Sequence, residues 1–357
     1  MPMTAAGPAE QFFIHDDDEP PRRAKRRGSR WILGGAATLV ILALLAAGVY
    51  LFTLQRSYGS NVTQFAEEDP GSDSIGLSEE ERPDDTEART ILLLGTDVGG
   101  GSGEDEDLPR VPGGGRSDTM MLVNIPESGD SVQVISIPRD LWVEIPGGYG
   151  WHKVNAGLAL GGDQGHWLAR ATVEDLLDVR IDHVTAVDLL GFVGLVEELG
   201  GVRVNSGYSE PFTTSEGYTF TPGEQFMDAD QALSFVRHRS SFPDGDLQRI
   251  RNQQAFIRAV IEQSVSPSNL ANPVQANNMV STFASHMMTD ADLTATRAGS
   301  MVWEARGATG DIQFATLPNG GSGWSPDGQW IWNQDTEAQA EISQALQDGT
   351  LSDYLSD

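Results

Sequence analysis

Residues 117–140 read SDTMMLVNIPESGDSVQVISIPRD, and this stretch decides the fold. Two apolar runs, 119–125 and 131–137, flank the turn-forming segment Pro-Glu-Ser-Gly-Asp, a pattern typical of two strands joined by a turn. Upstream, the run ILLLG at 91–95 stops at a glycine and predicts a buried strand. The three runs together indicate a β-sheet with an apolar interior.

Helical patterns follow and alternate with further strands. Apolar periodicity predicts helices over 166–178, 189–200, 228–239 and 247–263, then over about 270–286, 291–305 and 336–347. The runs HVTAVD at 183–188 and DIQFATL at 311–317 predict two more strands. This alternation is typical of an α/β layered domain, and we expect it to cover residues 89–357 without a further boundary.

The N-terminal part predicts a membrane anchor. Trp31 to Leu54 is uncharged and would form a helix of about 36 Å, enough to cross a hydrocarbon core of roughly 30 Å. Six basic residues between Arg22 and Arg30 precede it and favour a cytoplasmic N-terminus. A cleaved signal peptide is less favoured, because its apolar core is shorter and ends at small residues.

These features predict four regions. We expect a disordered cytoplasmic tail over 1–30, a single transmembrane anchor over 31–54 and an acidic extracellular stalk over 55–88. The α/β domain over 89–357 would then lie outside the cell, held at the cell membrane.

Composition excludes several classes of function. The chain has 357 residues, a formal net charge of −29 and no cysteine. Disulfide scaffolds, thiolate-bound metals and thiol nucleophiles are therefore excluded. The acidic balance argues against nucleic-acid binding, which needs a basic face. Neither lysine follows a glycine, so the phosphate-binding P-loop pattern is absent, and the six histidines lack metal-ligand spacing.

Three polar motifs stand at predicted strand ends. Asp97 follows the first strand in GTD, Arg116 and Asp118 open the second in GRSDTM, and Arg139 follows the third in SIPRD. Charged side chains at strand ends are common ligand positions in α/β folds. The plain alternatives are a turn or capping role for Asp97 and ion pairs for the others, including Arg139 with Asp140.

Lys153 lies in the motif WHKVNAG and is the single lysine after the N-terminal tail. A solvated surface lysine is the plain interpretation. Its isolation in a domain otherwise without lysine favours a specific role.

The most specific stretch is SFVRHRSSFPDGDLQRIRNQQ, residues 234–254. Arg237 and Arg239 alternate and would point the same way in extended backbone. Arg249 and Gln253 are four residues apart and would share a helix face. If they converge, these side chains predict a clamp for a polyanion, because guanidinium groups match phosphate oxygens. A solvated helix face that balances the negative surface is the alternative.

Taken in order, ILLLGTD, GRSDTMMLVNI, VISIPRDLWVEIPG, KVNAG, VDLLGFVGLVEELGGV, YTFTPGEQFMDADQALSFVRHR and DLQRIRNQQAFI closely resemble the LytR–CpsA–Psr family over residues 88–265. The resemblance implies a central mixed β-sheet flanked by helices. It also implies an exported, membrane-anchored phosphotransferase that moves a glycopolymer from an undecaprenyl-pyrophosphate carrier onto peptidoglycan through a phosphodiester.

The resemblance also implies roles for individual residues. Asp97 and Asp118 match carboxylates near Mg²⁺, with Mn²⁺ as a substitute, and Asp118, Arg139 and Arg239 would act in catalysis. The pyrophosphate contacts would be Arg116, Arg139, Arg237, Arg239, Arg249 and Gln253, with Lys153 near the same site. The walls of an apolar tunnel for the polyprenyl tail would include Leu176, Leu177, Leu189, Phe192, Val193 and Val196, although ordinary core positions are the alternative for some of them.

Two other functions fit the same residues. One is a lipid-pyrophosphate hydrolase in which water is the acceptor. The other is a non-catalytic, membrane-anchored receptor for polyprenyl carriers. The sequence names neither the glycopolymer, the acceptor hydroxyl, the general base nor the oligomeric state.

Overall fold

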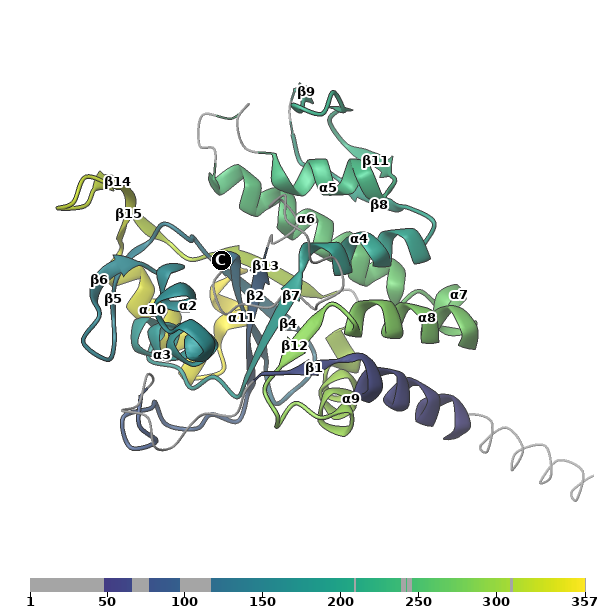
Figure 1. Ribbon diagram of the computed structural model, residues 1–357, viewed down its shortest axis with the longest axis horizontal. Helices are drawn as coiled ribbons and strands as arrows, with labels where there is room; N and C mark the ends of the chain where they lie inside the picture. The colour runs from purple at the N-terminus through teal and green to yellow at the C-terminus, as the bar shows by residue number, and fades with distance from the viewer. Residues whose placement is uncertain are drawn as a thin grey trace, which may run out of the picture. The chain divides into compact units, whose positions relative to one another are not determined.

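The computed structural model describes residues 48–65, 77–96, 117–208, 210–238, 242, 246–308 and 311–356 (Figure 1). Within these ranges the side chains of Thr96, Asp118, Leu189 and Asp246 are not described. Residues Tyr50–Asp357 form one compact unit.

A mixed β-sheet forms the centre of this unit. In the described part of the chain it has seven strands in the order β1–β12–β7–β2–β3–β4–β13. The β2/β7 and β4/β13 pairs are parallel, whereas β3 is antiparallel to both β2 and β4. The expected mixed sheet is therefore confirmed, with strands at β1 (Thr63–Gln64), β12 (Met287–Thr289), β7 (His183–Asp188), β2 (Arg89–Thr96), β3 (Ser117–Ile125), β4 (Val132–Ile137) and β13 (Ile312–Thr316).

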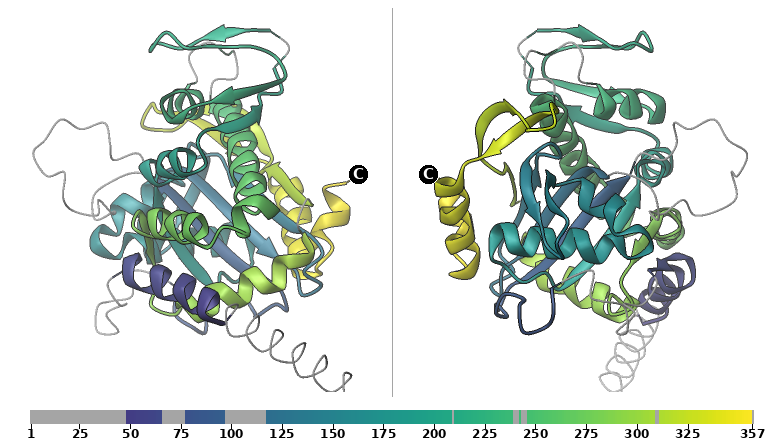
Figure 2. Two further views of the ribbon diagram at one scale, coloured as in Figure 1. Left: turned by 90° about the vertical axis from the view of Figure 1, so that its right-hand side faces the viewer. Right: turned by 60° about the vertical axis from the view of Figure 1, so that its left-hand side comes forward.

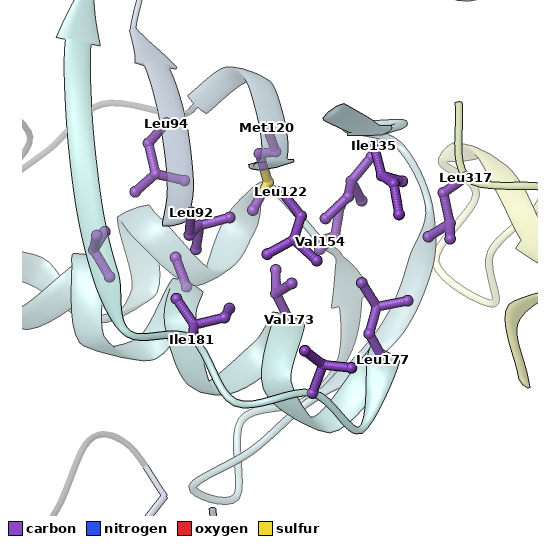
Figure 3. Close-up of a cluster of buried hydrophobic side chains, with 14 of the residues drawn as sticks. Leu92, Leu94, Met120, Leu122, Ile135, Val154, Val173, Leu177, Ile181 and Leu317 are labelled. Carbon is purple, nitrogen blue, oxygen red and sulfur yellow. The ribbon is translucent and has the colours of Figure 1, made fainter. Parts of the chain in front are cut away.

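Helices cover both faces of this sheet (Figure 2). Successive strand residues point to opposite faces, and Ile135 and Ser136 of β4 show the division. Ile135 packs in the main core with residues of α3 (Gly165–Leu177), as do Leu92 and Leu122 (Figure 3). Ser136 points the other way and accepts a hydrogen bond from Gln254 of α6 (Asp246–Ser264). The sheet is thus the middle of three layers.

A second core lies under the upper helices of Figure 1. It joins α4 (Leu189–Glu198), α5 (Ala229–Arg237) and α6 to two small two-stranded sheets, with Phe235 fully buried. These sheets are β8 (Val202–Asn205) with β11 (Glu224–Met227) and β9 (Phe212–Thr213) with β10 (Thr219–Phe220).

The predicted helices and long strands are all present, within a few residues of their expected ends. The remaining helices are α8 (Pro273–Ala284), α9 (Ala295–Glu304), α10 (Thr336–Gln347) and the short α2 (Ala156–Leu160), α7 (Pro267–Leu270) and α11 (Leu351–Tyr354). The sequence did not predict the short strands β1 and β12. It also missed two hairpins, β5 (Trp142–Ile145) with β6 (Gly150–Lys153) and β14 (Asn319–Trp324) with β15 (Trp330–Gln334).

The expected stalk over 55–88 is wrong for its described parts, which belong to the domain. Residues 48–61 are helical, and Ser57 donates a hydrogen bond of 2.6 Å to Asn277 of α8. β1 pairs with β12, and the buried Phe65 stacks on His166 at 4.1 Å between ring centroids. The acidic composition of the segment is typical of a solvated linker, so the sequence did not reveal the few residues that pack in the domain.

The expected anchor Trp31–Leu54 lies outside the described residues up to position 47, as does the expected tail over 1–30. Residues 48–54 are helical. Over the described ranges, no helix combines the length and apolarity that a membrane crossing needs.

A buried ion pair ties residues 77–88 to α3. The Glu174 carboxylate is fully buried and accepts hydrogen bonds from Arg82 Nη2 at 2.7 Å and from the Ile181 backbone N–H at 2.9 Å. Burial alone would lower the pKa of Arg82, but its bonds to Glu174 raise that pKa above its usual value. Arg82 thus compensates a charge that the core could not otherwise hold.

We expect Arg82→Ala to lower the free energy of unfolding by about 3–5 kcal/mol, because it leaves a buried carboxylate without this partner. Arg203 is a matched control, since its pair with Glu224 is exposed on both sides at 65% and 63%. Arg203→Ala should cost less than about 1 kcal/mol. Urea denaturation of both variants measures the difference; equal losses would contradict the structural role of Arg82.

A second buried pair joins β7 to β12. His183 Nδ1 lies 3.0 Å from Asp290 Oδ1, and both residues are buried. Burial alone would raise the pKa of Asp290. Hydrogen bonds from His183 and from the Val184 and Leu293 backbone N–H groups outweigh burial and lower it.

We expect Asp290→Asn to be less stable than the parent by about 1.5–3 kcal/mol near neutral pH. A lowered carboxyl pKa stabilises the folded state at pH values above the ordinary aspartate pKa of about 3.9. This stabilisation is lost as the pH falls through the lowered pKa. The difference between variant and parent should therefore shrink at acidic pH. Thermal denaturation across that range checks this, and a gap that is constant with pH would refute it.

Candidate functional site

The predicted motifs meet at one edge of the sheet. The carboxyl ends of β2, β4, β7 and β13 lie at this edge, together with the start of the antiparallel β3. In the strand register Thr96 is opposite Ser117, Met120 is opposite Ile137, and Ser136 is opposite Thr316. The described residues nearest the sequence motifs, Thr96, Ser117 and Ile137, therefore lie at this edge.

A local irregularity brings the first two motifs together. The β2–β3 register shifts between Gly95 and Thr96. A Cβ atom on Gly95 would lie 2.7 Å from the Thr119 Cβ, so a larger residue would force the strands apart. Asp97 and Arg116 lie just beyond this point and outside the described residues. The Asp118 backbone belongs to β3, but its side chain is not described.

Asp140 connects two of the predicted cations. Its carboxylate lies 2.7 Å from Lys153 Nζ and 3.5 Å from Arg139 Nε. Asp140 is itself 9% exposed, so the three groups form a compact, partly buried set at the end of β4. Arg139 and Lys153 are thus brought together, and the ion pair of Arg139 with Asp140 that the sequence left open as an alternative is also present.

Helix α6 brings the arginine motif to the same edge. Gln254 Nε2 donates to Ser136 Oγ at 2.9 Å and to the Ala315 carbonyl at 2.9 Å, which fixes α6 across β4 and β13. Arg249 and Gln253 lie on this helix four residues apart, as predicted. Arg249 is 6% exposed and is therefore not the surface-directed side chain that the sequence suggested.

Sequence reasoning missed Gln254 as the residue that docks the helix. The repeated glutamine of QQ at 253–254 was the available signal, because two adjacent amides point about 100° apart on a helix and can serve different neighbours.

Arg237 differs from its expected conformation. It is the last residue of α5, so Arg237 does not alternate with Arg239 along extended backbone. Only after it, at His238, does the backbone become extended, and Arg239 lies outside the described residues. Burial lowers the pKa of His238, against the opposing effect of Glu216. A hydrogen bond of 3.2 Å from Asn252 Nδ2 to the Phe235 carbonyl joins the end of α5 to α6.

The candidate tunnel residues do not form one surface. Leu176 and Leu177 of α3 pack with the main core, whereas Phe192 and Val196 of α4 pack with the second core. Val193 is partly buried on α4, and the side chain of Leu189 is not described. Leu177 is fully buried in the main core, which is the alternative that the sequence left open for some of these residues.

The expected metal ligands, Asp97 and the side chain of Asp118, lie outside the described part of the structure. Among the residues the structure describes, no group of three or more histidine, aspartate or glutamate side chains could hold a metal ion.

Comparison with known proteins agrees with the architecture. The sequence pattern of the LytR_cpsA_psr family matches residues 50–348. The polyisoprenyl-teichoic acid–peptidoglycan teichoic acid transferase TagU of Bacillus cereus (strain AH820) is 32% identical over 243 residues, which cover 67% of this chain and 72% of TagU. The cell wall biosynthesis protein LcpA of Corynebacterium glutamicum is 30% identical over 65% of this chain and 50% of its own.

Solved structures share the fold. Protein gbs0355 from Streptococcus agalactiae has a TM-score of 0.61 at 22% identity, over 74% of this chain and 88% of its own. TagV from B. subtilis has a TM-score of 0.58 at 22% identity, over 75% of this chain and 98% of its own. Because the family pattern covers most of the chain, and the strand edge carries the family's motifs in order, this protein belongs to the LytR_cpsA_psr family.

Proposed function

We propose that this protein transfers a glycopolymer from an undecaprenyl-pyrophosphate carrier to peptidoglycan and joins the two through a phosphodiester. The observation that carries the proposal is the docking of α6, with Arg249 and Gln253, onto the strand edge that leads to Arg139 and Lys153. Membership of a family that includes a relative named as a teichoic acid–peptidoglycan transferase supports it.

Electrostatics require a local cation cluster. A pyrophosphate diester is anionic, and the chain carries a net charge of −29, so the long-range field repels the substrate. Binding must come from short-range contacts with arginine, which is always charged and forms paired hydrogen bonds to phosphate oxygens. Arg116, Arg139, Arg237, Arg239, Arg249 and Gln253 are the proposed contacts, with Lys153 oriented by Asp140.

The reaction needs positioning more than covalent chemistry. A hydroxyl of the acceptor glycan attacks the phosphorus that bears the glycopolymer. The new P–O bond forms as the bond to the bridging oxygen breaks, undecaprenyl phosphate leaves, and the proton that the hydroxyl loses passes to the departing phosphate. Arg139 and Arg239 would stabilise charge on the equatorial oxygens, and Asp118 would act with them at the same strand edge.

Asp97 and Asp118 would hold Mg²⁺, which supplies charge neutralisation at the phosphates when it is bound. The polyprenyl tail would lie in an apolar passage between sheet and helices, for which Phe192, Val193 and Val196 on α4 remain the candidates. An anchor over Trp31–Leu54 would keep the protein at the membrane that carries this lipid substrate.

We expect Arg249→Lys to lower transfer of a labelled lipid-linked donor by about 10²-fold or more, because lysine keeps the charge but loses paired hydrogen bonding. Lysine also fills the buried position better than alanine would. Arg251 is the matched control: it lies two residues away on α6, is exposed, and bonds to Gln248 of the same helix. Arg251→Lys should transfer within about two-fold of the parent, on the usual scale of a surface substitution.

Assays with and without wall acceptor separate the three functions. Equal activity of Arg249→Lys and the parent would show that Arg249 is not a pyrophosphate contact. Release of undecaprenyl phosphate at the same rate without acceptor would favour the hydrolase, and stoichiometric binding without turnover would favour the receptor.

We also expect chelation followed by dialysis to abolish transfer, and Mg²⁺ or Mn²⁺ to restore it, since carboxylate oxygens prefer hard cations. Zn²⁺ should restore little activity, because the predicted ligands include neither cysteine nor histidine. Turnover of the labelled donor at each added metal concentration is the measurement. Full activity in excess chelator would refute a metal role for Asp97 and Asp118.

A further inference from the structure

Five of the eight tryptophans gather on two neighbouring hairpins that the proposed chemistry does not use. Trp142 and Trp151 lie on β5–β6, and Trp324, Trp330 and Trp332 on β14–β15. The hairpins touch through the Gln334 side chain, which donates to the Trp142 carbonyl at 3.0 Å. In Figure 1 the β14–β15 hairpin, in yellow, projects from the molecule beside β5 and β6.

The strand register puts three of these rings on one side of β14–β15. Trp324 is directly opposite Trp330, and Ser322 is directly opposite Trp332. Opposed residues share a face, as do residues two apart in a strand, so all three tryptophans lie on the same face. Ile331, on the other face, is buried at 3% exposure. Trp324 is 71% exposed and Trp330 is 37% exposed, whereas Trp332 is partly buried and packs against the main core.

The second hairpin continues this surface toward the candidate site. Trp142 is directly opposite Lys153, and Glu144 is directly opposite Trp151, so these four side chains share a face of β5–β6. Trp151 is 51% exposed. The Trp332 backbone N–H donates to the Asp140 carbonyl at 2.9 Å, and the Asp140 carboxylate holds Lys153. One end of a ligand bound to the tryptophans would therefore lie beside Arg139 and Lys153 at the strand edge.

We propose that the exposed Trp151, Trp324 and Trp330, backed by the partly buried Trp142 and Trp332, form a binding site for a neutral glycan strand built of N-acetylated hexoses. This inference rests on the proposed function, of which it names the acceptor site. The electron-rich face of an indole attracts the polarised C–H bonds on the flat side of a sugar ring. Residues 319–334 carry a single charged side chain, Asp327.

Composition favours a glycan over a lipid surface. In the described residues 319–334 the exposed large apolar side chains are Trp324 and Trp330, with no exposed aliphatic side chain beside them.

The test is titration of the full-length chain in detergent with chitohexaose, a neutral β-linked oligomer of N-acetylglucosamine, followed by calorimetry. We expect the parent to bind and Trp324→Ala to weaken binding at least ten-fold. Trp303 of α9 is the matched control, since it is similarly exposed at 68% but lies outside both hairpins. Trp303→Ala should bind within two-fold of the parent.

A conservative pair separates stacking from folding. Trp330→Phe should keep most of the affinity and Trp330→Ala should lose it, with unchanged circular dichroism in both. Failure of the parent to bind chitohexaose, or equal binding by the Trp324 and Trp303 variants, would overturn the site. So would Trp324-dependent binding to phosphatidylglycerol vesicles in place of the oligomer.

The experiments distinguish a failure of this site from a failure of the proposed function. Transfer that needs Arg249, together with chitohexaose binding that ignores Trp324, would leave the transferase standing without this acceptor site. Trp324-dependent binding in a protein that transfers nothing would leave the glycan site standing alone. If both hold, Trp324→Ala should raise the acceptor concentration needed for half-maximal transfer far more than it lowers the maximal rate.

Discussion

The close pairing of β2 with β3 at Gly95 is the constraint on which the site depends. A side chain at this position would meet Thr119, and the β2–β3 register shifts directly after it. β3 begins where β2 ends, with Ser117 opposite Thr96.

Two polar contacts attach the rest of the site to that edge. Asp140 holds Lys153 beside Arg139, and Gln254 holds α6 on β4 and β13. Neither Asp140 nor Gln254 is a proposed ligand of the phosphates. Both fix the position of residues that are, so the arrangement exists before substrate arrives. Preorganised cations of this kind lower the cost of binding an anion to a strongly acidic protein.

The same contacts relate the two halves of the proposed reaction. Asp140 contacts the donor-side cations through its carboxylate and the β14–β15 hairpin through its backbone carbonyl. Two substrates that must meet at one phosphorus would therefore be positioned by a single short segment. A tryptophan surface suits a neutral glycan and an arginine cluster suits an anion, so each substrate would bind to side chains of a different kind.

The sequence by itself determined the layered fold, the long strands and helices, and the strand-end placement of Asp97, Asp118 and Arg139. Apolar periodicity and glycine positions are local signals, and they mark such elements directly. Only the tertiary structure decided that β1 and Phe65 belong to the domain and that Leu177 is ordinary core. It also decided that Arg237 ends a helix, that Gln254 docks α6, and that five tryptophans far apart in the chain lie on two neighbouring hairpins. These features depend on contacts between residues far apart in the chain, which no local pattern of side chains encodes.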